Sequence, residues 1–76
     1  DLKTNFGKQL KQLRINADLT QSQLAEACDV SIDTISNIER GIHGPRFELL
    51  ERLTISLNIP AYASLPFLID KKNSSI

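Results

Sequence analysis

Apolar residues recur every three or four positions from the beginning of the chain, which is the spacing of one buried side of an α-helix. The first set consists of Phe6, Leu10, Leu13 and Ala17. It predicts a helix over about residues 3–16, with lysine and arginine side chains on its other sides. Glycine and proline are scarce and are interpreted as marks of the ends of elements.

A signal for a second helix begins at Thr20. In a capping box the Thr20 hydroxyl accepts a hydrogen bond from the backbone N–H of Gln23, and the Gln23 side chain reaches back to the N-cap backbone. The short helix that follows ends at Asp29. Its inward positions are Leu24, Ala25 and Cys28. We expect Cys28 to be a small buried side chain.

A third helix follows after a very short link. Ser31 is a suitable N-cap, and Gly41 stands just past the end, where helices favour glycine. Ile35 and Ile38 have the inward spacing. Because residues 28–30 leave almost no loop, the second and third helices must cross at a steep angle, which is the geometry of a helix-turn-helix.

The fourth predicted helix has Pro45 in its first position and ends at Asn58. Its expected buried side is formed by Phe47, Leu50, Leu53 and Leu57. Pro60 begins a short fifth helix that ends near Pro66. No segment alternates as a strand would, so the sequence predicts an all-α fold of five short helices.

Composition narrows the class of protein. The 76 residues suffice for one domain, expected over residues 1–69 with a polar tail over 70–76. A single cysteine excludes an intramolecular disulfide and favours a reducing, cytoplasmic setting. No apolar run reaches the roughly 18 residues of a membrane span. The net charge is zero, which argues against a general nucleic-acid binder, although residues 1–20 carry a net +2 and residues 21–41 a net −3.

Three stretches carry a resemblance to a known family. They are Leu19 to Glu26 (LTQSQLAE), Val30-Ser31 with Ile35 to Gly41 (ISNIERG), and Pro45 with Leu50 to Leu57. In order and spacing, residues 6–65 resemble the helix-turn-helix domain of the phage lambda-repressor-like, or Xre-type, DNA-binding family. The resemblance implies that fold and binding to double-stranded DNA. Two positions depart from the family, because Asp29 stands where Gly is usual in the turn and Thr54 where Ala is usual.

The third helix is the expected reading element. Opposite its core side it carries short polar side chains, which suits insertion into the major groove, although periodicity alone fits a solvated surface equally well. The resemblance implies base reading by Ile32, Asp33 and Asn37, with Thr34 and Ser36 as neighbours. Asn37 can pair with adenine, and Ile32 can pack on a thymine methyl group. Asp33 can accept from cytosine, or it can serve only the helix dipole.

Phosphate contacts are expected at the helix ends. Gln21 begins the second helix, where free N–H groups and the positive dipole end favour a phosphate. The resemblance implies that its amide touches the DNA backbone and orients Asn37 or its neighbour. Arg46 matches a phosphate-binding position of the family, and the secondary candidates are Arg40 and His43. Gln21 as a simple helix cap and Arg46 as an ordinary surface charge are the alternatives. Arg14 and Glu39 resemble the family's ion pair between the first and third helices.

More apolar residues follow the fourth helix than a small core can bury. The expected interface of a homodimer is Tyr62, Leu65, Phe67, Leu68 and Ile69. A two-fold dimer places its recognition helices on the half-sites of a near-palindromic operator, about 34 Å apart. The alternative is a lid over the first and fourth helices.

The leading interpretation is a sequence-specific DNA-binding transcriptional regulator, expected to be a repressor of prophage, mobile-element or controller type. An antitoxin-type module, which binds a protein toxin and regulates its own operon, is the alternative and fits the acidic middle of the chain. A fragment of a longer regulator also fits a sequence without Met. One His and one Cys cannot form a zinc site, and no acid–base pair is supported, so we expect neither an enzyme nor a cofactor or metal.

Overall fold

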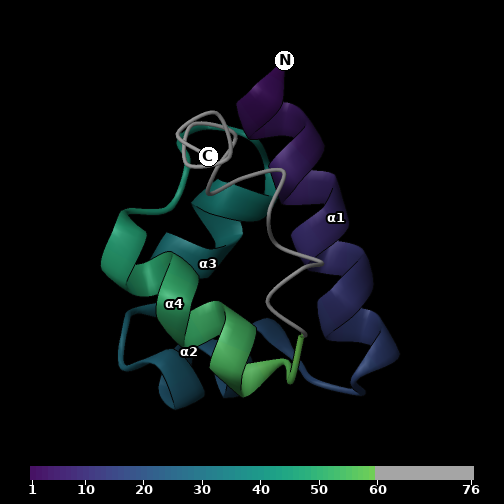
Figure 1. The fold of residues 1–76 in the computed structure, drawn as a ribbon, viewed down its shortest axis with the longest axis vertical. Helices are drawn as coiled ribbons and strands as arrows, with labels where there is room; N and C mark the ends of the chain where they lie inside the picture. The colour runs from purple at the N-terminus through teal and green to yellow at the C-terminus, as the bar shows by residue number, and fades with distance from the viewer. Residues whose placement is uncertain (60–76) are drawn as a thin grey trace, which may run out of the picture.

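The computed structural model describes residues 1–59, and all the regular structure in this range is helical (Figure 1). The helices are α1 (Leu2–Asn16), α2 (Gln21–Cys28), α3 (Ile32–Glu39) and α4 (Phe47–Ser56). The first four predicted helices are therefore confirmed. The predicted fifth helix, the domain boundary at residue 69, the tail and the five interface residues Tyr62, Leu65, Phe67, Leu68 and Ile69 lie outside the described residues.

The predicted ends of α2 and α3 are confirmed atom by atom. The Gln23 backbone N–H donates to the Thr20 hydroxyl at 3.0 Å, and the Thr20 N–H donates to the Gln23 side-chain oxygen at 2.8 Å. The Ser31 hydroxyl accepts from the Thr34 N–H at 3.2 Å. Asp29 adopts the left-handed conformation in the turn, with φ 59° and ψ 45°. Local signals thus determine where both helices of the motif begin and end.

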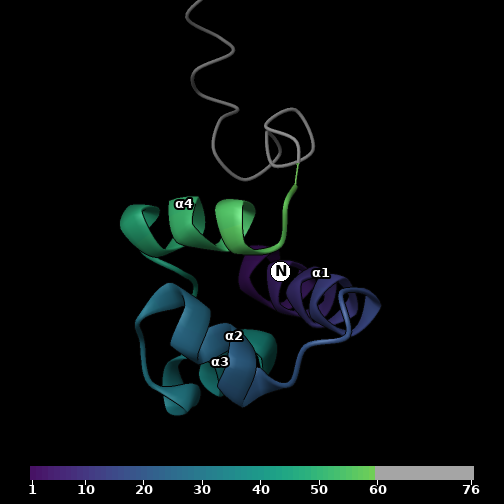
Figure 2. The same cartoon turned by 90° about the horizontal axis from the view of Figure 1, so that it is seen from below.

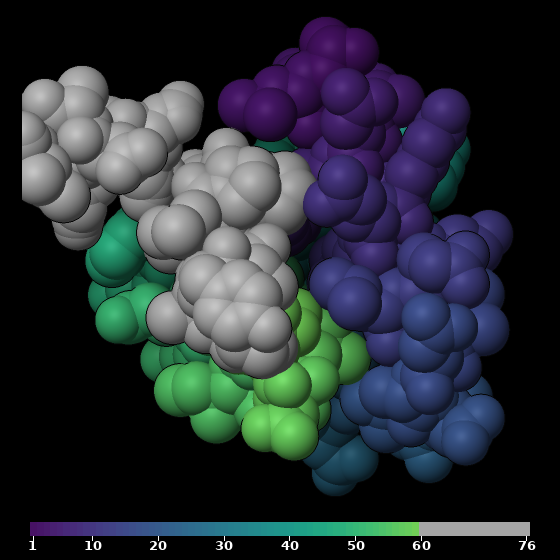
Figure 3. Space-filling view, turned by 45° about the vertical axis from the view of Figure 1, so that its right-hand side comes forward, coloured from purple at the N-terminus to yellow at the C-terminus, as the bar shows by residue number. Residues whose placement is uncertain are grey.

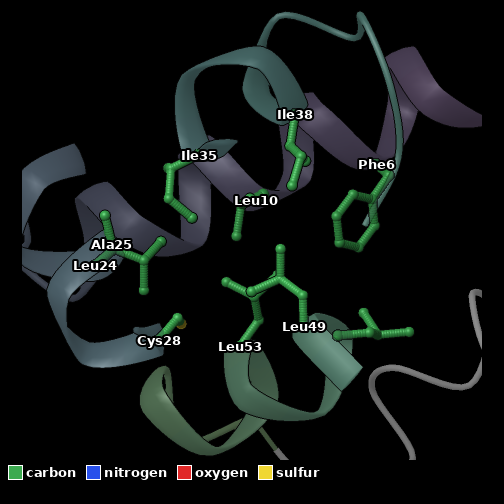
Figure 4. Packing of buried hydrophobic residues seen from close by; sticks show 10 residues of the cluster. Phe6, Leu10, Leu24, Ala25, Cys28, Ile35, Ile38, Leu49 and Leu53 are labelled. Carbon is green, nitrogen blue, oxygen red and sulfur yellow. The ribbon is translucent and has the colours of Figure 1, made fainter. Parts of the chain in front are cut away.

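The four helices enclose one small core. In Figure 2, α4 lies on one side of the core, the α2–α3 pair lies on the other, and α1 runs alongside both. Helix α3 packs against α2 and α1, and α2 also packs against α4. The buried cluster, most of it labelled in Figure 4, is Phe6, Leu10, Leu24, Ala25, Cys28, Ile35, Ile38, Leu49, Leu50 and Leu53. The prediction that Cys28 is buried is confirmed.

Of the four residues predicted to form the buried side of α1, Phe6 and Leu10 are buried and the other two are not. Leu13 is 39% exposed and Ala17, which caps the helix, is exposed, whereas Arg14 between them is buried. The reason is tertiary, because the last turn of α1 faces a carboxylate on α3 rather than apolar side chains.

The predicted buried side of α4 also needs correction. Phe47 is 66% exposed, and Leu49 takes a place in the core that the sequence had not assigned to it. Pro45 lies before the helix, since Arg46 is the N-cap and Phe47 the first helical residue. The remaining predicted positions fit, because Leu50 and Leu53 are buried and Leu57 packs half-buried against the core.

Gly7 lies inside α1 rather than at the end of an element. A Cβ atom at this position would lie 2.8 Å from the backbone oxygen of Glu39 and even closer to that of Ile38. The backbones of α1 and α3 therefore approach too closely for any side chain at Gly7. This close packing is one of the contacts that orient α3.

An apolar groove of about 300 Å³ lies between α1 and α4. Figure 3 shows the surfaces of α1, in purple to blue, and of part of α4, in green. Within residues 1–59 the lining of the groove is uncharged and consists of Phe6, Gln9, Leu10, Gln12, Leu13, Leu50, Leu53, Thr54, Leu57 and Ile59. The last residue of the described range thus lies at this groove. The hydroxyl of Thr54, where the family usually has Ala, donates to the Glu51 carbonyl oxygen at 2.7 Å.

Candidate nucleic-acid interface

The turn between α2 and α3 is held by its backbone. The Val30 N–H donates to the Ala25 carbonyl at 3.0 Å, and the Asp29 N–H donates to the Glu26 carbonyl at 3.1 Å. These bonds close the end of α2 around the left-handed Asp29. The chain then enters α3 through the Ser31 cap. Helix α3 is therefore positioned by local geometry at its N-terminal end.

The side of α3 opposite the core is accessible where the sequence predicted base reading. Ile32 is 46% exposed and Asp33 is exposed, both in the first turn. Ser36 and Asn37 are half-buried, while Ile35 and Ile38 are fully enclosed in the core. A short helix with an accessible first turn and a buried opposite side can approach a groove of DNA with its N-terminal half.

Thr34 is separated from the other four candidates. Its hydroxyl lies 3.0 Å from the Ser31 hydroxyl, and it borders a second groove of about 620 Å³ between α3 and α4. That groove also contains His43 and Arg46 from the loop before α4. The structure thus brings Thr34 together with two of the residues predicted to contact phosphate.

Two arginines and a histidine between the end of α3 and the start of α4 are exposed, and together they are called the cationic edge, although the exposed acid Glu48 lines the same groove as His43 and Arg46. Arg46 is exposed and is the N-cap, and its side chain makes no capping hydrogen bond. His43 is exposed, with Nδ1 3.5 Å from the Gly44 carbonyl oxygen. Arg40 is exposed at the C-cap of α3. All three are therefore free to meet the negative charge of a phosphate.

The predicted ion pair between Arg14 and Glu39 is confirmed. Arg14 Nε donates to Glu39 Oε2 at 2.7 Å and Arg14 Nη2 donates to Glu39 Oε1 at 3.1 Å, with the two side chains 10% and 3% exposed. The hydrogen bond to Glu39 raises the pKa of Arg14, and the negative charge of Glu39 acts in the same direction, whereas burial opposes both. The pair joins the end of α1 to the end of α3.

Gln21 has a partner that the sequence did not predict. Its amide nitrogen donates to Glu39 Oε1 at 3.0 Å, and this acceptor lies two positions after Asn37 in the chain. Glu39 has acceptor capacity left after it binds Arg14, and the Gln21 amide uses it. The sequence could indicate the ion pair, but not this third partner.

Arg52 is a residue that sequence reasoning missed. Its Nη1 donates to the Cys28 carbonyl at 3.2 Å, at the C-terminal end of α2. A cation at this end satisfies a free carbonyl and complements the helix dipole. Any helix leaves its last carbonyl groups without a partner within the helix, so a donor at the end of α2 could be expected. Only the tertiary structure shows that this donor comes from α4.

Two general findings concern the described part of the chain. No helix within residues 1–59 is long and apolar enough to cross a membrane. In the same range, no three side chains among His, Cys, Asp and Glu gather where they could hold a metal ion.

Comparison with known proteins identifies the family. Residues 5–58 match the family described as "Helix-turn-helix domain". RghRB of Bacillus subtilis, an uncharacterized HTH-type transcriptional regulator, is 41% identical over 56 residues, which is 72% of this chain and 40% of the relative. Control protein C.BamHI of Bacillus amyloliquefaciens is 30% identical over 63 residues, 82% of this chain and 78% of the relative. The match spans less than half of RghRB but most of C.BamHI. The chain therefore belongs to the helix-turn-helix domain family, in agreement with its Xre-type sequence motifs.

Proposed function

We propose that this chain is a sequence-specific DNA-binding transcriptional regulator that places α3 in the major groove. The observation that carries the proposal is the accessible first turn of α3, in a chain that belongs to the helix-turn-helix family. The names of both relatives point the same way, since one is an HTH-type transcriptional regulator and the other a control protein. Neither name mentions a toxin, so no finding favours the antitoxin alternative.

Base reading is assigned to the outer side of α3. Asn37 offers an amide that can pair with the N6 and N7 atoms of adenine, and Ile32 offers an exposed methyl surface for thymine. Asp33 can accept from the amino group of cytosine. Ser36 supports these contacts from a half-buried position. Thr34 takes no base-reading role in this proposal, because it is bonded to Ser31 and borders the cationic edge.

Phosphate contacts are assigned to two places near α3. One is the cationic edge formed by Arg40, His43 and Arg46. The other is Gln21 at the beginning of α2, where backbone N–H groups of the first turn have no partner within the helix. Contacts at both places would hold α3 in position on the DNA, as phosphate contacts do when they set the register of a protein on DNA.

The test begins with selection of duplexes from a random pool by the full chain. On the selected duplex, Asn37→Ala should lower affinity by about 1–3 kcal/mol and relax the choice of base at one position. Arg46→Ala should instead weaken matched and mismatched duplexes alike and reduce the salt slope by about one unit. Lys11→Ala, which removes an exposed charge from α1, is the control for net charge. If Asn37→Ala weakens all duplexes equally, Asn37 does not read a base.

We further propose that the chain binds a near-palindromic operator as a homodimer, as a repressor of controller type. The control protein C.BamHI supports the subtype through its name alone. The apolar groove between α1 and α4 supports the dimer, because the exposed Leu13 lines it and so does Ile59, which leads into the apolar segment 60–69. Leu13→Glu in the groove, or Leu65→Glu with Phe67→Glu in that segment, should give a folded monomer in sedimentation with reduced affinity. A wild-type chain that sediments as a monomer at high concentration would refute the dimer.

A further inference from the structure

One carboxylate, that of Glu39, connects three helices. It belongs to the last residue of α3, it binds Arg14 of α1 through both oxygens, and its Oε1 also accepts from the Gln21 amide of α2 at 3.0 Å. The side chain is only 3% exposed. The Glu39 carboxylate is therefore engaged by partners inside the protein and offers very little surface to DNA itself.

The segment that leads into α2 is tied to the same place. Arg14 Nη1 donates to the Leu19 carbonyl at 2.9 Å, and the Leu19 N–H donates to the Arg14 carbonyl at 3.1 Å. The capping box of Thr20 then begins the helix, and Gln21 follows at its first position. The first turn of α2 is thus attached to the ion pair on both sides, at Leu19 through Arg14 and at Gln21 through Glu39.

The chemistry of the partner determines how the Gln21 amide is turned. An ionised carboxylate has acceptors only, so the amide must present its nitrogen to Glu39. One of the two N–H bonds of Nε2 is then used, and no hydrogen bond within residues 1–59 uses the second. Without Glu39, nothing described at this position would favour the nitrogen over the oxygen, and an oxygen turned outward would repel a phosphate.

We propose that Glu39 is a positioning residue for DNA binding, which holds the Gln21 amide so that its second N–H bond faces a DNA phosphate. The inference rests on the phosphate contact proposed above for Gln21, and adds that a buried acid on α3 controls this contact. In this proposal Glu39 has a second role besides its ion pair with Arg14. Glu39 thereby connects the orientation of α3, the helix proposed to read bases, with the contact between α2 and the DNA backbone.

A double-mutant cycle separates this role from simple support of the fold. The variants are Gln21→Met, Glu39→Gln and the double variant, each titrated against the duplex selected by the full wild-type chain. If Glu39 acts through Gln21, we expect Glu39→Gln to lower affinity about tenfold in the wild-type background and less than about twofold in the Gln21→Met background. Equal losses in both backgrounds would overturn the proposal, because a fold effect does not depend on Gln21.

Ethylation interference on the same duplex identifies the individual phosphates that the protein contacts. A loss of protein stability alone would not remove the signal of one particular phosphate. Gln21→Met and Glu39→Gln should both lose the signal at one and the same phosphate, while the signals attributed to Arg46 persist. If Glu39→Gln leaves that phosphate signal unchanged, the proposal is wrong. If Glu39→Gln fails to fold, Arg14→Met with Glu39→Met replaces the pair by apolar side chains of similar length, a change that often preserves folding. The cycle is then run with this double replacement in place of Glu39→Gln, and the same two outcomes decide it.

The free protein provides a third measurement. In nuclear magnetic resonance spectra, the Gln21 side-chain amide signals should differ from those of the exposed Gln9 and should move toward them in Glu39→Gln. Unmoved signals would overturn the proposal. If the wild-type chain selects no duplex at all, the DNA-binding function fails and this inference fails with it. Selection of a duplex followed by equal losses in the cycle refutes only the role of Glu39.

Discussion

Replacing Gly7 by alanine tests how closely α1 must approach α3. The added Cβ would lie 2.8 Å from the Glu39 oxygen, 3.0 Å from the Glu39 carbonyl carbon, and nearer still to the Ile38 oxygen. Real Cβ atoms essentially never come within 3.0 Å of another atom. All three neighbours are backbone atoms, which cannot rotate away as the end of a side chain can. The two helices must therefore separate by more than half an ångström.

Two opposing terms set the size of the effect. Alanine is favoured over glycine inside a helix by about 1 kcal/mol, which would stabilise α1. Overpacking of a close contact costs about 1–3 kcal/mol, and here the shift also stretches the nearby Arg14–Glu39 pair. The pair loses strength quickly with distance because it is largely buried. We expect Gly7→Ala to destabilise the protein by about 1–2 kcal/mol and to lower affinity for DNA by tilting α3.

Urea denaturation followed by circular dichroism measures this change, with a lower midpoint at an unchanged slope. The matched control is Gly44→Ala, because among residues 1–59 a Cβ there meets only Lys3 Cγ at 3.8 Å, an ordinary van der Waals contact. That control should be neutral or more stable by up to about 1 kcal/mol. A Gly7→Ala protein as stable as the Gly44→Ala control would refute the close-packing argument.

Three further changes test other parts of the structure by the same denaturation assay. Asp29→Gly should raise stability by up to about 1 kcal/mol, because Asp29 has φ 59°; a loss would mean that the aspartate makes a favourable contact in the turn. Thr20→Ala should cost about 1 kcal/mol through the lost cap, whereas the exposed Ser22→Ala should have little effect; equal effects would argue against the capping box. Arg14→Met should cost about 3–5 kcal/mol by leaving the Glu39 carboxylate buried without a cation, and Arg14→Met with Glu39→Met should recover most of it. No recovery would show that the carboxylate is not the source of the loss.

The sequence by itself determined the helices and the motif. Thr20 and Ser31 begin helices through side-chain bonds to backbone groups three residues away, so the signal and its effect are local. Gly41 ends α3 with φ 79°, a backbone conformation open to glycine at no cost. The family resemblance was equally readable, because it consists of such local signals and of inward apolar spacing. The Arg14–Glu39 pair was predicted through the family resemblance alone, because its two residues lie 25 positions apart in the chain.

Tertiary structure decided which side of each outer helix is buried and what completes the polar cluster. Leu13 and Arg14 are adjacent, and only the carboxylate across the interface makes Arg14 the buried one. Phe47 and Leu49 differ in burial because α4 begins after Arg46 and turns its apolar side by its contact with α2. The bond from Gln21 to Glu39 and the need for glycine at position 7 arise between elements far apart in the chain. Such contacts depend on distances between helices, which periodicity along one helix does not contain.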